Sequence, residues 1–530
     1  MRELCDTGIV QVSSGEASLR LSAPASAPRT LRTLIADRVS RLPQRERRVL
    51  QGLAILGEPA SSVLLSATIQ QLLPSVDRHI AVLEQKGLVQ RIGTTQVRFA
   101  SPLYQEIVLD AMALPVAQEL HAAAAVVYRE QPTGGGEAAE RMASHLLASG
   151  LKADAVDAYW RAGRERREVG QVEAAVRSML RGAELADVRA TSPELLLSWL
   201  IELGVVVAQA SSAPGLREVA SPLVRELRDR GDERQRVLGM VECARALAAV
   251  NLFDDAIGVV DSLEQGVASL TVADDPERLE LEAAVLGVAC EVCARQGRVV
   301  RGKLACEKLE ALGVVLPPRT RLAMSVLRAS SGDAVGALAL LDELDTSAGA
   351  SDVALLVALA KHRAIVHFNQ RDFGAAAREA NRAARMALTA GLRFEAALAL
   401  HNLGDAFDRL GDHPRAYAAF VESLELSRQL DQERLGNLNQ IHLCMLDGLR
   451  SSEGVEEKLR SLVRFADARS YLWDVVEGRF LLARLHAAHG SHEKARRLLD
   501  EVLANAAEHG HGLIAADARE LLAKVTPRDV

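Results

Sequence analysis

Helix-breaking residues recur at nearly equal intervals over most of the chain. Between them, apolar residues follow the spacing of amphipathic helices. The eight intervals average about 40 residues, enough for one helical hairpin each. This period predicts a stack of helical hairpins, and we expect such a superhelix over residues 137–527. The helix-breaking positions are Gly170, Gly215, Leu252, Gly297, Gly332, Asp372, Gly411, Ser452 and Gly490.

The composition suits closely packed helices. Hydrophobic residues make up 49% of the 530 residues, yet aromatic residues make up only 3%, so the apolar content is mostly Ala, Leu and Val. Ala and Leu are also strong helix formers. We therefore expect an all-α fold.

One repeat is better formed than the others. In "LHNLGDAFDRLGDHPRAYAAFVES", Leu400, Leu403, Gly404 and Phe407 share one predicted helix, and the next helix carries small and aromatic residues at matching offsets, namely Ala416, Phe420 and Ser423. This pattern resembles the tetratricopeptide repeat (TPR), in which such residues let two helices pack closely. The resemblance implies a right-handed TPR-like α-solenoid.

The triplet Asp372-Phe373-Gly374 spells the metal-binding motif of protein kinases. Phosphoryl transfer also requires a glycine-rich loop, a strand lysine and a catalytic-loop Asp and Asn, and the sequence contains no such motifs. The triplet occupies the same interhelical position as Gly411-Asp412-His413 one repeat later. We interpret it as a turn, with Phe373 as a core plug, and expect no enzymatic activity, no catalytic residues and no cofactor.

The cysteines predict neither disulfides nor a metal site. Cys290 and Cys293 form a C-x-x-C inside an Ala-rich helical pattern without a second ligand pair, so we expect buried helix residues. The six cysteines are Cys5, Cys243, Cys290, Cys293, Cys306 and Cys444. The N-terminus lacks a signal-peptide profile, and the longest apolar stretch, "LLLSWLIELGVVVAQA", is only 16 residues long. These features favour a cytoplasmic protein without a membrane segment.

The first part of the chain shows a different pattern. Two helices separated by Pro43, a third from Pro74-Ser75 to Gly87, and the alternating strands "LVQRI" and "QVRFA" around a glycine turn predict a winged-helix domain over residues 30–112. A helix and a Gly-rich linker follow over 113–136. Residues 30–100 have a net charge of +5, leaving −12 for the rest, so contact with nucleic acid is expected only here.

Two regions resemble signal-transduction ATPases with numerous domains (STAND). "VRFASPLYQEIVLDAM" is similar to the segment that follows the nucleotide-binding module, and "HNLGDAFDRLGDHPRAYAAFVESLELSRQL" to the superhelix of members linked to bacterial Ser/Thr kinases; ATP-dependent transcription activators belong to the same superfamily. The resemblance implies that residues 1–29 are the end of an ATPase module, with no kinase or P-loop module in this chain. Members usually carry His in the phrase "RFASPLYQE", where this chain has Ser101.

Two functions remain open. The first is a non-catalytic scaffold in signal transduction or transcription regulation, whose superhelix binds a protein segment or a small-molecule inducer. The second is a DNA-binding regulator that uses the winged helix. In the latter case Arg78, His79 and Lys86 would contact DNA, but Asp77 and Glu84 on the same helix disfavour it.

The scaffold hypothesis points to the concave wall of the superhelix. Helical geometry turns His401, Asn402, Asp405 and Asp408 to other faces than the packing face, and we expect that these side chains are not all buried. The TPR resemblance gives Asn402 the role of bonding an extended peptide, with His401 and Asp405 as neighbours. Residues placed by the period alone are Asn369, Asn439 and Arg484. The acids favour a basic or amide-rich ligand, whereas the alternative is that these polar residues are simply solvated or bonded between helices.

Overall fold

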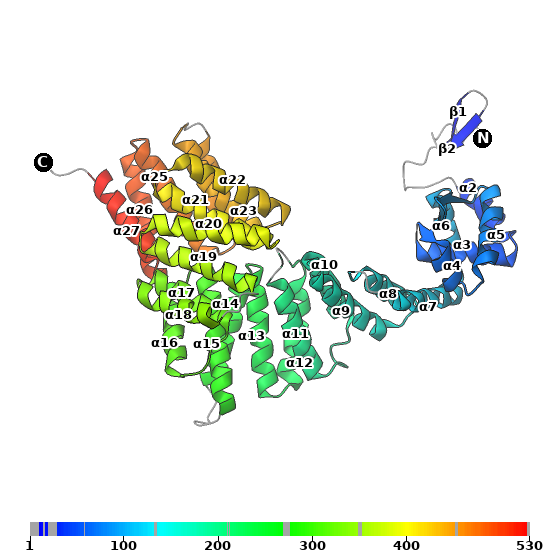
Figure 1. Cartoon of the computed structure of the whole chain (residues 1–530), viewed down its shortest axis with the longest axis horizontal. Helices are drawn as coiled ribbons and strands as arrows, with labels where there is room; N and C mark the ends of the chain where they lie inside the picture. Colours follow the sequence, from blue (N-terminus) through cyan, green and yellow to red (C-terminus); the bar gives the residue numbers. More distant parts are fainter. Residues whose placement is uncertain are drawn as a thin grey trace. The chain divides into compact units, whose positions relative to one another are not determined.

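The computed structural model is predominantly helical and divides into two compact units (Figure 1). Unit 1 comprises Met1–Ala186 and unit 2 comprises Asp187–Val530. The predicted superhelix begins at helix α8, but its first three helices group with unit 1. The structure describes residues 10–13, 16–19, 29–57, 59–131, 135–208, 210, 213–268, 276–347, 352–450 and 454–526.

Unit 1 contains short strands among its helices. Strands β4 and β5 form the expected hairpin, and β3 adds to the far side of β5, which gives an antiparallel sheet of order β3-β5-β4. The elements are β1 (Val10–Ser13), β2 (Glu16–Leu19), α2 (Arg29–Ser40), α3 (Gln44–Leu56), β3 (Ala60–Ser61), α4 (Ser62–Thr68), α5 (Leu73–Gln85), β4 (Val89–Ile92), β5 (Gln96–Phe99), α6 (Pro102–Asp110), α7 (Leu114–Glu130), α8 (Glu137–Ala148), α9 (Lys152–Glu168) and α10 (Val172–Leu185).

Local sequence explains most of these boundaries. Pro43 precedes α3, and Pro74 lies in the first turn of α5, where the missing amide hydrogen costs nothing. Ser101 caps α6 by accepting a hydrogen bond from the Leu103 amide at 3.3 Å. Helix α4 and strand β3 were not predicted. A helix of seven residues and a strand of two are too short for a periodic pattern.

Unit 2 is a series of antiparallel helical hairpins, an α-solenoid (Figure 1). From α19 onward the first helix of each hairpin begins every 39 or 40 residues, which confirms the predicted period. The helices are α11 (Pro193–Val207), α12 (Leu216–Arg230), α13 (Glu233–Ala249), α14 (Phe253–Ala268), α15 (Pro276–Gln296), α16 (Val299–Ala311), α17 (Pro318–Ser330), α18 (Ala334–Ser347), α19 (Val353–Asn369), α20 (Phe373–Thr389), α21 (Arg393–Arg409), α22 (His413–Gln429), α23 (Glu433–Gly448), α24 (Val455–Asp467), α25 (Leu472–Ala488), α26 (His492–His509) and α27 (Gly512–Val525).

The best-formed repeat packs as the TPR resemblance implies. Gly404 on α21 faces the ring of Phe420 on α22 so closely that an added Cβ would lie 2.8 Å from two ring carbons. Ser423, one turn further along α22, donates a hydrogen bond to the Ala397 carbonyl at 2.7 Å. A glycine and a serine at these offsets therefore bring the two backbones together.

The kinase-like triplet lies at the end of the predicted turn: Gln370 and Arg371 form the turn, and Phe373 and Gly374 are already the first residues of α20. Asp372 caps α20, because its carboxylate accepts a hydrogen bond from the Ala375 amide at 2.9 Å, and Asp412 caps α22 in the same way. Phe373 is half-buried rather than a full core plug, and its ring meets Phe368 edge-on at 5.2 Å. The Asp372 side chain thus has a structural role.

The hairpin series of unit 2 closes on itself. His511, before α27, donates a hydrogen bond to the Gly297 carbonyl at 2.6 Å, although 214 residues separate the two. Ser470 similarly bonds Asp254 at 2.6 Å, and Arg434 donates to the Arg295 carbonyl at 3.2 Å. The last helices therefore contact α14–α16, and the inner faces of the intervening hairpins enclose a common space.

The cysteines occupy the positions predicted for buried helix residues. Cys290 and Cys293 are fully buried on α15, and burial raises the pKa of the Cys293 thiol to about 12. Cys5 lies outside the described residues. Within the described ranges, no group of three or more His, Cys, Asp or Glu side chains could hold a metal ion. Within the same described ranges, no single helix is long and apolar enough to span a membrane. Two helices joined at a bend, Pro102–Asp110 and Leu114–Glu130, meet the length and hydropathy criteria only when they are taken together.

Candidate functional site

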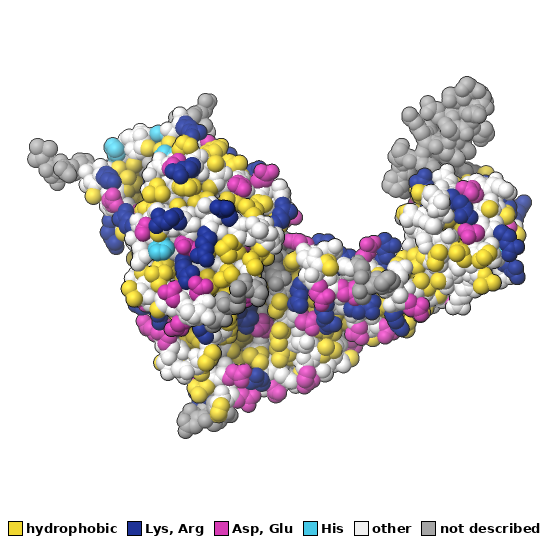
Figure 2. All heavy atoms as spheres, in the orientation of Figure 1, with side chains coloured by type: hydrophobic (Ala, Val, Ile, Leu, Met, Phe, Trp, Pro, Cys, Tyr) yellow, Lys and Arg dark blue, Asp and Glu magenta, His cyan; other side chains and the backbone are white. Residues whose placement is uncertain are grey.

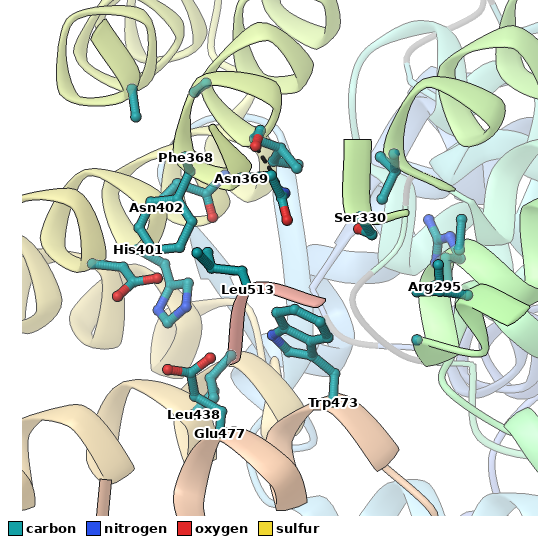
Figure 3. A pocket seen from close by; sticks show the side chains of 18 of the residues that line it. Arg295, Ser330, Phe368, Asn369, His401, Asn402, Leu438, Trp473, Glu477 and Leu513 are labelled. Atoms are coloured by element: carbon teal, nitrogen blue, oxygen red, sulfur yellow. Dashed lines mark hydrogen bonds between the residues drawn. The ribbon is translucent and has the colours of Figure 1, made fainter. Parts of the chain in front are cut away.

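A cavity of about 210 Å³ lies inside the closed hairpin series of unit 2 (Figure 3). Most of its lining comes from the first helices of six successive hairpins, α15 to α25, and from the last helix α27, with Val299 of α16 and Ala376 of α20 added. Its volume is below the roughly 300–1,000 Å³ of pockets for drug-sized ligands. The cavity could therefore hold a small molecule or a side chain of a longer segment.

Four of the six predicted groove residues line this cavity. They are Asn369 on α19 and His401, Asn402 and Asp405 on α21. Figure 3 shows Asn369, His401 and Asn402 on the same side of it. Neither Asn439 nor Arg484 is part of the lining.

The packing of helices α21–α25 explains why Asn439 and Arg484 do not line the cavity. Asn439 is fully buried, where it donates a hydrogen bond to Ser423 at 2.8 Å and contacts the Nδ1 atom of His401 at 2.9 Å. Arg484 pairs with Asp408 at 2.6 Å. Asn439 thus follows the alternative interpretation, bonding between helices.

The four side chains are not all buried, as expected, but His401 and Asp408 are. His401 is 9% exposed and Asp408 is 3% exposed, because partners on neighbouring helices, Asn439 and Arg484, cover them. His401 still borders the cavity with part of its ring. Asn402 and Asp405 are partly exposed, as expected.

The amide groups of the lining differ in their availability. Asn369 donates a hydrogen bond to the Ile365 carbonyl of its own helix at 2.9 Å. For Asn402, the described part of the chain supplies no hydrogen-bond partner to the side-chain amide. Asn402 therefore offers both a donor and an acceptor to a ligand.

Two neutral histidines form part of the wall. His442 on α23 stacks on Phe420 at 4.5 Å, and its ring meets that of His401 edge-on at 5.2 Å. Burial lowers the pKa of both imidazoles. His442 lies 40 residues after Asn402, so one exact period leads from one lining residue to the other.

One side of the cavity is acidic. Asp405 and Glu477 both line it, and each has Arg409 as a distant cation, with N–O separations of 3.7 Å and 3.6 Å respectively. The closest partner of Arg409 is Asp517 on α27. Burial raises the pKa of Asp405 to about 6 and that of Glu477 to about 8. Burial therefore favours the protonated, uncharged form of Glu477 at neutral pH.

Two arginines border the cavity elsewhere. Figure 3 shows Arg295 across the cavity from His401 and Glu477. Its guanidinium donates to the Ala248 and Ala249 carbonyls at 3.2 Å and 3.3 Å. Arg434 pairs with Asp474 at 2.8 Å. Apolar side chains lie between the charged regions, namely Phe368, Leu438, Trp473 and Leu513.

Sequence reasoning missed several lining residues, including Arg295, Trp473 and Glu477. They lie 70 residues or more from the best-formed repeat's Asn402, and the closure of the hairpin series brings them to the same cavity. No local motif marks them. The exact 40-residue period could have identified His442 in place of Asn439.

The predicted DNA contacts of unit 1 lie on and beside α5. Arg78 is exposed and His79 is half-buried, but Lys86 pairs with Glu46 on α3 at 2.6 Å. Asp77, on the same helix, pairs with Arg91 at 3.2 Å. One of the three predicted DNA contacts is thus held by an acid of the protein.

Comparison with known proteins finds only distant likenesses. No protein-family model and no curated protein matches the sequence. Solved structures that are similar include a STAND protein with a tetratricopeptide repeat sensor from Pyrococcus horikoshii (12% identity, 95% of this chain and 68% of that chain, TM-score 0.44). Another is a Rap protein complexed with Competence and Sporulation Factor (13% identity, 62% of this chain and 97% of that chain, TM-score 0.43). A third is yeast Tom70 (12% identity, 73% of this chain and 96% of that chain, TM-score 0.31). At these values the comparisons carry no argument about family, ligand or partner.

Proposed function

We propose that this chain is a non-catalytic scaffold whose solenoid captures a segment of another protein or a peptide in the cavity of unit 2. The observation that carries this proposal is the lining itself: nine helices contribute to one cavity with apolar walls and acidic and basic sides. A peptide offers apolar side chains, amides and charges to match such walls. The free amide of Asn402 supplies the pair of hydrogen bonds that a peptide backbone needs.

Several observations support a binding role over catalysis. Asp372, the acid of the kinase-like triplet, caps a helix. Both histidines of the lining are held neutral by burial, and Arg434 is paired with Asp474. The STAND resemblance adds a role for this binding in signal transduction or transcription regulation.

The test is a selection of peptides from a random library on the full chain. Selected peptides should bind the wild-type chain and bind the Asn402→Ala/Asp405→Ala double variant at least tenfold more weakly, since a hydrogen bond to a charged group contributes about 1.5–3 kcal/mol. A matched control is Asn381→Ala/Glu425→Ala, which makes the same changes at exposed positions on the second helices α20 and α22. Failure to select any peptide, or equal affinity of the two double variants, would reject the proposal.

We also propose that residues 30–112 form a winged-helix domain, supported by the order of helices and the β3-β5-β4 sheet. DNA binding by this domain is the second candidate function. It is favoured by the Lys and Arg side chains that Figure 2 shows at the edge of unit 1 where α5 lies. The Lys86–Glu46 pair disfavours it. A gel shift with genomic fragments at physiological salt decides: sequence-selective retention that is lost in Arg78→Ala would establish the second function.

A further inference from the structure

We propose that Asp405, Glu477 and His442 form a subsite within this cavity that binds a primary ammonium group, the head of a lysine side chain on the captured peptide. The inference rests on the proposed function and names the chemistry that the bound segment must carry. The three residues come from three first helices, α21, α25 and α23, and all three line the cavity.

The two carboxylates lack the partners that buried acids normally have. Glu477 is 3% exposed, and its Oε1 atom accepts no hydrogen bond; the Oδ1 atom of Asp405 is likewise buried and unbonded. Arg409 approaches both only at 3.6–3.7 Å, too far for a hydrogen bond. Buried acceptors without donors are costly, so a ligand that donates to them gains affinity.

His442 adds a third buried side chain with an unbonded polar atom. The side chain is 1% exposed and lines the same cavity, and its Nδ1 atom has no hydrogen-bond partner. Burial keeps the imidazole neutral, and a neutral imidazole carries one acceptor nitrogen. The subsite therefore combines two unbonded carboxylate oxygens with an imidazole.

The identity of the ligand group follows from this acceptor set. An ammonium carries three donors and no acceptor, and can direct them to three separate side chains. A guanidinium is planar and suits paired acceptors of a single group, which separate helices do not present. Leu438, Leu513 and Trp473 line the approach with apolar surface, which suits the four-carbon stem of lysine.

The ionisation of the acids supports the same chemistry. Burial raises the pKa of both carboxyls, and a bound ammonium would lower both pKa values again. The other charged groups that face them are Arg409, Arg484, Asp408 and Asp517. Arg484 pairs with Asp408, and the Nη1 atom of Arg409 pairs with Asp517. The Nε and Nη2 atoms of Arg409 lie 3.7 Å from Asp405 and 3.6 Å from Glu477 and make no hydrogen bond, so a bound ammonium would share the two acids with this arginine. Binding of the ammonium should therefore release protons near pH 7.

The experiment measures binding of n-butylammonium, which reproduces the lysine head and stem, to the full chain by ligand-observed NMR. 1-Butanol and butyrate are the neutral and anionic comparisons. Butylammonium should bind saturably and about 10- to 100-fold more tightly than either, and Glu477→Gln should remove this preference. Glu425→Gln on the outer helix α22 is the matched control and should retain it. Equal binding of butylammonium and butanol, or no saturable binding of butylammonium, would overturn the subsite.

Peptides separate this inference from the proposed function. N-terminally acetylated peptides selected on the chain should contain lysine, and its replacement by norleucine or acetyl-lysine should weaken binding at least tenfold, with arginine also weaker. Peptides that bind without a lysine preference would reject the subsite and leave the scaffold function standing. Butylammonium binding that depends on Glu477, without any peptide binding, would reject the scaffold function and leave the ammonium subsite standing.

Discussion

The contact between Gly404 and Phe420 provides a quantitative test of how the solenoid packs. Replacing Gly404 by Ala would place a Cβ 2.8 Å from two carbons of the Phe420 ring and 3.0 Å from a third. The ring has little room to move, because it is fully buried and stacks on His442 at 4.5 Å. The substitution must therefore push apart α21 and α22 or displace the wall of the cavity.

The change in stability caused by Gly404→Ala combines two opposing contributions. Overpacking of a well-packed core costs about 1–3 kcal/mol, whereas Ala in place of Gly stabilises a helix interior by about 1 kcal/mol. Gly258→Ala on α14 isolates the second term, because a Cβ at that exposed position meets nothing within 4 Å. The difference between the two variants should therefore be about 2 kcal/mol.

Hydrogen exchange measured by mass spectrometry is the assay, because it reports the local free energy of opening of each helix pair. Exchange in α21 and α22 of the Gly404→Ala chain should be roughly 5-fold faster than in the wild type, whereas exchange in α14 of the Gly258→Ala chain should be roughly 5-fold slower, so the two local effects differ by a factor of about 30. Exchange in α21 and α22 that is unchanged or slower would show that the two backbones do not depend on the missing side chain, and would refute the packing argument.

Three further predictions concern single features. Asp372→Ala should destabilise the chain by about 1 kcal/mol in thermal unfolding, because α20 loses its cap. Asp372→Asn should not, because Asn can still cap α20. Loss of a magnesium-dependent phosphotransfer activity in the Asn variant would contradict this structural role. Because burial raises the pKa of Glu477 to about 8, the folded chain keeps a proton that the unfolded chain releases, so stability should fall as pH rises from about 4.5 to about 8. Glu477→Gln should flatten this dependence in urea unfolding, and an unaltered pH profile would refute the assignment. Lys86→Ala should leave Glu46 without its partner and lower thermal stability without changing DNA retention in a gel shift, whereas weaker retention would favour a DNA contact.

The hairpin architecture of unit 2 could be predicted because each hairpin repeats the same local requirements. A small residue where helices touch, such as Gly404, and an acid that caps the second helix, such as Asp372 or Asp412, recur at a fixed period. Periodicity could not reveal β3, whose two residues become a strand only by pairing with β5. Figure 2 shows basic and acidic side chains interspersed over the visible face of unit 2, without a patch of one charge among the described residues of that face.

The candidate site could be predicted only in part, because the fold closes over long sequence distances. Asn402 and Asp405 follow from helix geometry within one repeat. Glu477 joins them only because α25 packs beside α23 and α27 returns to α16, contacts that no local pattern encodes. Asn439 lies three residues before His442, the lining residue that the 40-residue spacing of α21 and α23 pairs with Asn402.

Photo-crosslinking with a selected peptide tests the central claim most directly. A peptide that carries a photoreactive leucine would be irradiated on the full chain, and the crosslinked residues would be identified by mass spectrometry. We expect crosslinks to the first helices of unit 2 around the cavity, at residues such as Leu438, Trp473 and Leu513. Crosslinks confined to unit 1, or to the outer helices α20 and α22, would contradict the assignment of the cavity as the binding site.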